Sequence, residues 1–328
     1  MRGAQVVLLA VAASVLAACG KPVDTAKETF ERSTVPAGQI SAETGATGKP
    51  RTNDPVFAND ELRKLDPCGL LTDDILAAVG TPAESRVQDF GSCSNYMTDK
   101  NDDELSVTIY VGETINGAEG ADKNIGGLPA MESELDDHSA CFVSVITSTN
   151  PNFGIRVQIG GDGEKLCEIG TTVLTAAVEL IRTDPPVRQD KRGTIAATDP
   201  CTLVDAAAMN TALGEETTIS PYSLHWCNWV GEKVNGGIWF RTGYDPKDSS
   251  VDPGTPVDLG GGVTGYQKGT VESSASCRLE WRHRSTGDDG ADEIIEVDVD
   301  KREPAAGDNG CPTAIAVAKL LIPALPKP

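Results

Sequence analysis

The sequence predicts an α+β protein made of two tandem copies of a small antiparallel sheet packed by helices, each copy with two disulfides. Eight of the nine cysteines fall into two sets of four with similar spacing, which indicates an internal repeat. Within each set, short segments alternate apolar and polar residues, as half-buried strands do. The length of 328 residues suits two domains of ordinary size.

The repeat is visible as motifs in the same order. An Asp-Pro-Cys motif at 66–68 recurs at 199–201, and the cysteine spacings are 25, 48 and 26 in the first copy and 26, 50 and 34 in the second. Glycine-rich segments at 126–127 and 260–262 occupy the same place in each copy. We interpret these glycines as turns that need positive φ, rather than as a site for an anion.

Each copy begins with a short helix. Thr72 and Asp205 stand where an N-cap belongs, and Gly80 and Gly214 are the expected C-caps. Strands are predicted where apolar residues alternate with polar ones, at 105–111, 153–159, 277–281 and 295–299. Helices at 172–181 and 313–321 close the copies. This order predicts a sheet with one face covered by helices and the other in water.

The N-terminus is typical of an exported bacterial lipoprotein. Residues 1–18 form a signal peptide with Arg2 as its positive charge and an apolar core too short to span a membrane comfortably. The core ends in Leu16-Ala17-Ala18-Cys19, an aliphatic residue and two small residues before a cysteine. We expect acyl chains such as palmitate on Cys19, which would hold the protein to the outer face of the cell membrane. A plain signal peptide with an incidental cysteine is the alternative.

The rest of the chain divides by composition. Residues 19–63 are polar and poor in large apolar side chains, which predicts a flexible tether. The first disulfide-stapled domain is expected at 64–182 and the second copy at 198–328. Residues 183–197 are polar and contain prolines, as an interdomain linker does.

The cysteines other than Cys19 are even in number in a chain expected to leave the cytoplasm, which favours disulfides. Four cysteines allow three pairings in each copy. We predict that sequence neighbours pair, because their spacing is matched in both copies. The predicted bridges are Cys68–Cys93, Cys141–Cys167, Cys201–Cys227 and Cys277–Cys311.

Together these motifs resemble the actinobacterial lipoproteins of "domain of unknown function 3558". The resemblance rests on the Asp-Pro-Cys opening, the capped helix, the Gly-Gly turn, the later cysteine pair and the lipobox with its tether. It covers 66–181 and, more weakly, 199–321. The first copy departs from the pattern after its second cysteine, where Ser94-Asn95-Tyr96 replaces the Asn228-Trp229 of the second copy. The resemblance implies a cell-envelope setting and no established activity.

Charge limits the partners. The formal net charge is −21, and without Arg2 of the signal it becomes 27 − 49 = −22. Such a surface repels nucleic acid and anionic lipid headgroups, so we expect no nucleic-acid partner. The expected partners are the membrane, through lipid on Cys19, and an unidentified small ligand or envelope protein.

Residues suited to catalysis are sparse. The histidines are His138, beside two aspartates, His225, expected on a strand next to a disulfide, and His283, expected in solvent. Neither His138 nor any other histidine is matched between the copies, and no serine-elbow or phosphate-loop motif is present. Cysteines in bridges cannot act as nucleophiles. We therefore predict no enzymatic activity, no cofactor and no catalytic or metal-binding residues.

Two further segments are possible sites. The acidic group Asp288, Asp289, Asp292 and Glu293 matches no calcium loop, and we interpret it as a solvated loop. The connection from Gly112 to Ala140 is longer than a hairpin loop, and such connections are often functional.

These observations favour a non-enzymatic binding or sensing lipoprotein of the cell envelope. The candidate binding surfaces are the long loops and the crevice between the two copies, since ligands often bind between domains. The alternatives are an envelope enzyme with an unrecognised site and a scaffolding lipoprotein that supports another envelope protein. Convergent titratable groups in a pocket would favour the enzyme, and a flat apolar patch would favour a protein partner.

Overall fold

The computed structural model describes residues 52, 54–163, 165–189, 192–249, 252–286 and 291–328. These residues belong to one compact unit. The signal peptide, Cys19 and most of the predicted tether lie outside the described residues. We call residues 54–189 the first half of the molecule and residues 192–328 the second half.

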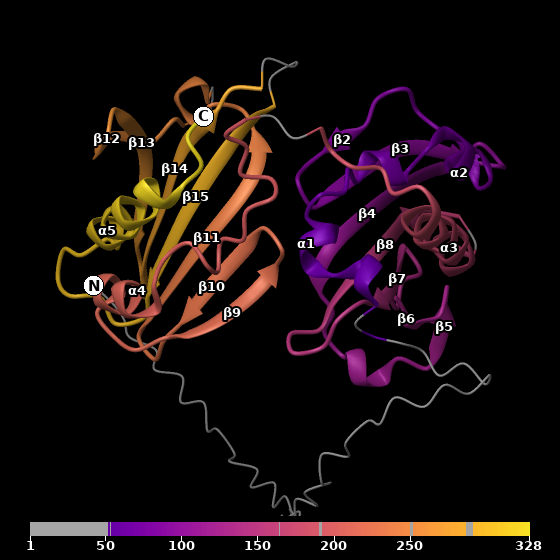
Figure 1. The fold of residues 1–328 in the computed structure, drawn as a ribbon, viewed down its shortest axis with the longest axis horizontal. Coiled ribbons are helices and arrows are strands. Elements are labelled where there is room, and N and C mark those ends of the chain that lie inside the picture. Colours follow the sequence, from indigo (N-terminus) through magenta and orange to yellow (C-terminus); the bar gives the residue numbers. More distant parts are fainter. Residues whose placement is uncertain (1–51, 53, 164, 190–191, 250–251, 287–290) are drawn as a thin grey trace, which may run out of the picture. The chain divides into compact units, whose positions relative to one another are not determined.

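Strands dominate both halves (Figure 1). Those of the first half are β1 (Gly80–Thr81), β2 (Val87–Gln88), β3 (Ser92–Asp99), β4 (Glu104–Thr114), β5 (Lys123–Ile125), β6 (Leu128–Glu134), β7 (Ala140–Ile146) and β8 (Phe153–Gly161). Those of the second half are β9 (Thr218–Ser223), β10 (Trp226–Val230), β11 (Val234–Gly243), β12 (Thr255–Gly260), β13 (Val263–Val271), β14 (Ala275–Arg284) and β15 (Asp292–Lys301). All of their pairings are antiparallel.

The helices are short except for two. They are α1 (Asn59–Leu62), α2 (Asp73–Ala77), α3 (Leu166–Thr183), α4 (Ala206–Leu213) and α5 (Cys311–Leu321), with 3-10 turns η1 (Pro55–Phe57), η2 (Cys68–Leu70), η3 (Ala118–Gly120), η4 (Pro246–Asp248) and η5 (Ile322–Ala324). Thr72 and Asp205 cap α2 and α4 as predicted, each accepting a backbone N–H. Gly214 caps α4 in the left-handed region, but the prediction for Gly80 is wrong, because α2 ends at Ala77 and Gly80 starts β1.

The two halves have the same strand order. In the first half the order is β3-β4-β8-β7-β6-β5, and in the second it is β10-β11-β15-β14-β13-β12. The closing helix, α3 or α5, packs on one face of its half, against β7 and β8 or β14 and β15 (Figure 1). Gly170 permits this close packing on α3, since a methyl group there would lie 2.7 Å from the Val143 side chain. Each helix thereby covers its own hydrophobic core.

The strands form one sheet of 15 strands rather than two separate sheets. The link between the halves is a single residue pair, Glu113 with Ser223, between the end of β4 and β9. The Thr114 hydroxyl adds a hydrogen bond of 2.9 Å to the Pro221 carbonyl. The reason lies in β4, whose register shifts between Val111 and Glu113, so that its last residues extend to the second half. The alternation of apolar residues, which ends at Val111, does not predict this link.

All four predicted disulfides are confirmed. Cys68–Cys93 and Cys201–Cys227 join the opening of each half to β3 or β10, and Cys141–Cys167 and Cys277–Cys311 join β7 or β14 to the closing helix. The bridges therefore occupy the same places in both halves.

Two segments of polar composition, predicted as a flexible tether and an interdomain linker, contain residues that are packed. At the end of the predicted tether, Phe57 and Leu62 are buried in the first core, and Arg182 lies over the Phe57 ring at 4.9 Å. In the predicted linker, Ile195 is fully buried in the second core. These few apolar residues anchor segments whose average composition is polar, which is why composition alone does not predict their packing.

The connection between Gly112 and Ala140 is also ordered. It contains η3 and the hairpin of β5 and β6, which pairs Ile125 with Leu128 across a turn. Gly126 and Gly127 form that turn with φ of 58° and 81°, and Gly260–Gly262 have positive φ at the matching turn. The prediction of structural turns is confirmed, and the segment is part of the sheet rather than a long loop.

Candidate functional site

The face of the second half's sheet opposite its helix carries a row of large polar and aromatic side chains. Trp226 on β10 is opposite Trp239 on β11, Trp239 is opposite Glu296 on β15, and Glu296 is opposite Glu280 on β14. Trp226 and Trp239 are half-buried, and the two glutamates are buried. Two glutamates directly opposite one another repel, so other groups must stabilise this row.

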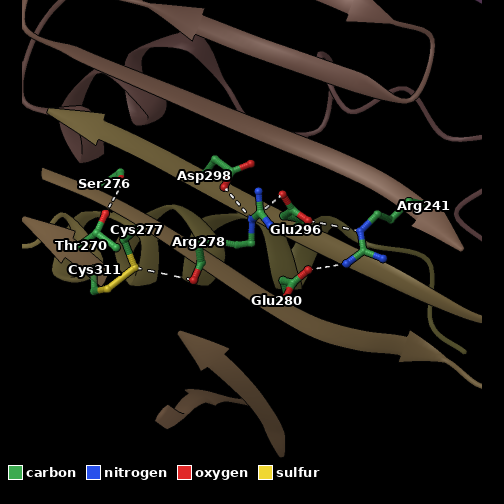
Figure 2. A network of polar contacts seen from close by, with 9 residues as sticks. All are labelled: Arg241, Thr270, Ser276, Cys277, Arg278, Glu280, Glu296, Asp298 and Cys311. Atoms are coloured by element: carbon green, nitrogen blue, oxygen red, sulfur yellow. Dashed lines mark hydrogen bonds and ion pairs between the residues drawn. A yellow bond between two sulfur atoms is a disulfide. The ribbon is translucent and has the colours of Figure 1, made fainter. Parts of the chain in front are cut away.

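Arg241 supplies much of that stabilisation. Its guanidinium binds Glu280 through Nη2 and Glu296 through Nε, the latter at 3.2 Å (Figure 2). Arg278 binds the other oxygen of Glu296 at 3.0 Å and Asp298 at 3.5 Å through its Nε. Both oxygens of Glu296 are therefore engaged by arginines, and the row is a closed ionic network on a sheet surface.

Burial changes the acidity of this network. Desolvation raises the pKa of Glu280, and the neighbouring Glu296 raises it further. Desolvation likewise raises the pKa of Glu296, with Asp298 adding to the shift. The arginines oppose these shifts because they stabilise the charged carboxylates.

Aromatic rings continue from the network along the same face. Trp226 and Trp239 stack with centroids 5.2 Å apart and planes 20° apart, and Tyr222 lies 4.5 Å from Trp226. The Arg241 guanidinium lies over the Trp239 ring at 5.4 Å. Trp226 and Arg241 both contact the Trp239 ring, and these contacts fix its orientation.

The first half contributes residues from β2 and the turn after it. Asp89 Oδ1 accepts the backbone N–H of Phe90 and that of Thr242, both at 2.7 Å. The Thr242 hydroxyl donates to the Gln88 carbonyl at 2.8 Å. These bonds hold the two halves together beside the network. Burial raises the pKa of Asp89, and its hydrogen bonds with Thr242 and Phe90 oppose that shift.

A cavity of about 360 Å³ opens at this place. The first half lines it with Gln88, Asp89, Ser92 and Ser94, and the second half with Trp239, Arg241, Thr242, Arg278 and Glu296, while Val87 completes the wall. The volume is within the lower part of the range of small-molecule sites. An aromatic ring, hydroxyls, carboxylates and guanidiniums meet here, and carboxyl groups of raised pKa in a cavity are typical of functional sites. This is our candidate site.

A second cavity, of about 780 Å³, lies in the first half beside Tyr96, Met97 and Leu105. The carboxylate that lines it, Glu104, is exposed to solvent. We prefer the smaller cavity because both halves line it and because its carboxyl groups, Asp89 and Glu296, have pKa values raised by burial.

The three histidines lie outside both cavities. His225 lies in the turn between β9 and β10, not on a strand, and is buried against Phe90 with its Nε2 2.7 Å from the Ala196 carbonyl. Burial lowers its pKa to about 3. The prediction that His283 lies in solvent is wrong. Its side chain is half-buried, and its Nε2 lies 2.9 Å from the Gly193 carbonyl.

His138 is exposed and lies 3.0 Å from Glu134, rather than beside the aspartates that precede it. Asp137 instead accepts hydrogen bonds from Ser139. The side chain is therefore on the surface with a single carboxylate partner. This arrangement gives a general base no substrate cavity within the described residues.

The predicted acidic loop divides. Asp288 and Asp289 lie outside the described residues, and Asp292 and Glu293 begin β15. Glu293 is only 2% exposed and accepts hydrogen bonds from the Thr194 hydroxyl at 2.7 Å and the Ile195 amide at 3.0 Å. The prediction of a solvated loop is wrong for Glu293, because the packed interdomain segment covers it. The described residues contain no group of three His, Cys, Asp or Glu side chains placed to hold a metal ion.

Residue-by-residue prediction does not find the cavity. Sequence alternation places Glu280 and Glu296 on the outward face of their strands, and it does not distinguish Asp89 or Arg241 from other charged residues. The signal is present as charged residues in register with tryptophans on neighbouring strands, but it becomes visible only once strand pairing is known. The crevice between the copies is, however, among the predicted binding surfaces.

Comparison with known proteins gives one match. Residues 14–180 match a family model described as "Protein of unknown function (DUF3558)". No curated protein and no solved structure matches the chain significantly. Within the described residues, no helix is both long enough and apolar enough to cross a membrane.

Proposed function

The chain belongs to the DUF3558 family of proteins of unknown function, and we propose that it is a non-enzymatic binding module of the cell envelope. In this proposal the folded part is held outside the cytoplasmic membrane by lipid on Cys19. Its ligand binds in the cavity lined by both halves. The single observation that carries the binding role is the meeting of Trp239, Arg241, Glu296 and Asp89 in one cavity.

We propose further that the two halves arose by tandem duplication. The same strand order, the same placement of two disulfides and a closing helix on the same strands support this proposal. In this view the units are 64–182 and 198–328, joined by 183–197. The continuous sheet is then a later addition, because the link between the halves is one residue pair at the end of β4.

The lipid anchor is supported by the Leu-Ala-Ala-Cys motif at 16–19. Cys19→Ala is expected to release the chain from the membrane fraction or leave its signal uncleaved. Mass spectrometry of the N-terminal peptide tests this directly. An unmodified Cys19 inside a mature N-terminal peptide would contradict the proposal.

Titratable groups converge on the cavity, which is the feature expected of the enzyme alternative, but the contacts that these groups make support binding over catalysis. The Glu296 carboxylate is engaged by Arg241 and Arg278 on both oxygens, so it is not free to act as a nucleophile or base. The eight cysteines of the folded part are all in disulfides. The groups left for a ligand donate and accept hydrogen bonds, which suits recognition.

The test is a fragment library screened against the mature chain carrying Cys19→Ala. Indole N–H resonances in ¹H–¹⁵N spectra report binding, and Trp239→Phe assigns the resonance next to the cavity. We expect hits to shift the Trp239 signal and to leave that of Trp229, which is 1% exposed in the second core, unchanged. A screen in which every hit leaves Trp239 unmoved would contradict the proposed site.

A further inference from the structure

We propose that the cavity between β2 and β11 binds an uncharged carbohydrate, an inference that rests on the proposed binding function. The lining residues decide the class of ligand in three ways: through their charge balance, through their free hydrogen-bonding groups and through the exposed part of an indole ring.

The two arginines at the cavity are already paired with carboxylates of the protein. Arg241 pairs with Glu280 and Glu296, and Arg278 pairs with Glu296 and Asp298. Neither arginine is therefore an unopposed cation that would attract a phosphate or carboxylate. An anionic ligand would also approach Asp89 and Glu296, and a cationic ligand would approach the two guanidiniums. A ligand without net charge avoids both costs.

The hydrogen-bonding groups left over are both donors and acceptors. Among the described residues, Ser92 Oγ and the terminal nitrogens of Arg278 make no hydrogen bond, and the Asp89 carboxylate lines the same cavity. Arg278 is the most accessible of the network, with its side chain 56% exposed. Vicinal hydroxyl groups of a sugar each donate and accept, so a diol can donate to the carboxylate and accept from the guanidinium at once.

Trp239 supplies an apolar surface beside these groups. Its ring lines the cavity and is fixed by Trp226 on β10 and Arg241 on its own strand. The axial C–H groups of a pyranose carry partial positive charge and are attracted to the negative face of an indole, while the ring hydroxyls stay free for polar contacts. A ligand with one apolar face and a polar rim matches this combination better than a flat aromatic compound or a flexible aliphatic chain.

Size is compatible with this class. A cavity of about 360 Å³ is near the lower end of the range for small-molecule sites, so it suits one or two sugar rings rather than a bulky lipid. The cavity is open to solvent on the side of Val87, whose side chain is 61% exposed. A longer glycan could therefore extend outward from the bound rings.

The experiment uses the mature chain with Cys19→Ala and three uncharged disaccharides: maltose, cellobiose and N,N′-diacetylchitobiose. Glucuronic acid and glucose 6-phosphate serve as anionic comparators of the same ring size. Isothermal titration calorimetry measures affinity, and the Trp239 indole resonance locates binding. We expect at least one disaccharide to bind with millimolar or better affinity and to shift the Trp239 signal saturably. The anionic compounds should bind more weakly.

Two site variants and one control sharpen the result. Trp239→Leu should weaken the binding of that disaccharide about tenfold, since stacking on an indole contributes roughly one decade of affinity. Asp89→Asn keeps the Oδ1 acceptor for the two backbone amides but removes the carboxylate, and it should weaken binding severalfold. Tyr96→Leu, in the second cavity, should leave the affinity unchanged. Circular dichroism confirms that each variant is folded before affinities are compared.

The possible failures are distinguishable. Binding of the anionic compounds alone, with loss in Trp239→Leu, would overturn the inference that the ligand is uncharged and keep the proposed binding site. Loss of disaccharide binding in Tyr96→Leu but not in Trp239→Leu would move the site to the second cavity and overturn the inference. If neither sugars nor library fragments shift Trp239, both the inference and the proposed function fail. Cleavage of a bound disaccharide, seen by chromatography, would overturn the non-enzymatic interpretation.

Discussion

The two halves share a backbone plan but use the uncovered face of the sheet differently. The row of Trp226, Trp239, Glu296 and Glu280 in the second half corresponds, by strand order and cysteine register, to Ser92, Tyr110, Arg156 and Ser144 in the first half. The first row has one arginine, one tyrosine and two serines. The second has two carboxylates and two indoles. The same positions can therefore be either a plain sheet surface or a site.

The two rows also balance charge by different means. In the first half, Arg156 binds Glu113 at 3.1 Å and donates to the Ser144 hydroxyl at 3.3 Å. In the second half, two adjacent carboxylates need Arg241 and Arg278 from neighbouring strands. A network of this size is costly to bury, so its retention suggests a use other than stability. The second row thus contains an arginine-bound carboxylate pair that the first row does not have.

The largest expected effect on stability comes from truncating a buried aromatic side chain in either core. Phe57→Ala in the first core and Trp281→Ala in the second should each reduce the free energy of unfolding by about 3–5 kcal/mol, because both side chains are fully or almost fully buried. Val56→Ala, next to Phe57 but 39% exposed, should change it by less than about 0.5 kcal/mol. Urea unfolding followed by tryptophan fluorescence measures all three. A Phe57→Ala effect as small as that of Val56→Ala would show that the segment before Arg63 is not part of the core.

The next largest loss of stability is expected from removing the disulfides that hold the closing helices. Replacing both members of Cys141–Cys167 or of Cys277–Cys311 by alanine should cost about 3–4 kcal/mol in each case by the loop-entropy estimate. The sequence separations are 26 and 34 residues, so the two losses should agree to within about 0.5 kcal/mol. Thermal unfolding of the two double variants provides the comparison. A several-fold difference between them would show that the two bridges do not play equivalent roles.

Two histidines, His225 in the second half and His138 in the first, should contribute unequally to the free energy of unfolding. His225→Ala should cost about 1–3 kcal/mol at pH 7, because it leaves the buried Ala196 carbonyl without its partner. His138→Ala should change stability by less than about 0.5 kcal/mol, since that side chain is on the surface. Chemical denaturation at pH 7 distinguishes the two.

The lowered pKa of His225 also predicts that stability depends on pH. Burial lowers the pKa of His225 to about 3, below its unfolded value of 6.5. Its neutral form therefore contributes stability that is present above pH 6.5 and is lost as the pH falls toward 3, at up to about 1.4 kcal/mol per pH unit. The advantage of the wild type over His225→Ala should shrink by roughly 2 kcal/mol between pH 7 and pH 5. An advantage that stays constant over this interval would show that His225 titrates normally.

The smallest expected effect concerns two carboxylates, Glu280 of the second row and Glu113, which pairs with Arg156 of the first row. The pKa of Glu280 is raised by burial and by Glu296, so its stabilising contribution is present at low pH and is lost as the pH rises through the raised pKa. Glu280→Gln should therefore gain stability relative to the wild type between pH 4 and pH 8. Burial also raises the pKa of Glu113, but Arg156 opposes that shift. Glu113→Gln should therefore gain less. Melting temperatures at the two pH values measure both gains, and equal gains would remove the distinction between the rows.

Local chemistry predicts a large part of this molecule. The helix caps at Thr72 and Asp205, the alternation along β4, β8, β14 and β15, and the pairing of cysteines each depend on residues close in sequence or on spacing repeated in both halves. The crevice between the halves is predictable only as a region. Its residues cannot be chosen from the sequence, because the partners of Glu296 lie on β11 and β14, and β11 is distant from it along the chain.

The errors have one physical origin. Gly80 is expected to end a helix and starts a strand. Phe57 and Ile195 are expected in a tether and a linker and are buried. Glu293 is expected in solvent and accepts hydrogen bonds from a covering segment. In each case a contact across the chain decides the outcome against local composition. Hydrophobic burial is non-directional and acts wherever a surface is available, so a single anchor residue can order a polar segment.

Residue identity and spacing are enough to predict the two-fold repetition of motifs, the disulfide partners and the strand-forming segments. The three-dimensional arrangement was needed to establish that β4 reaches β9, that Asp89 meets Thr242, and that Trp239 and Glu296 line a shared cavity. The difference arises because strand register and the packing of one half on the other set distances between residues far apart in the chain, and hydrogen bonds and ion pairs act only over a few ångströms.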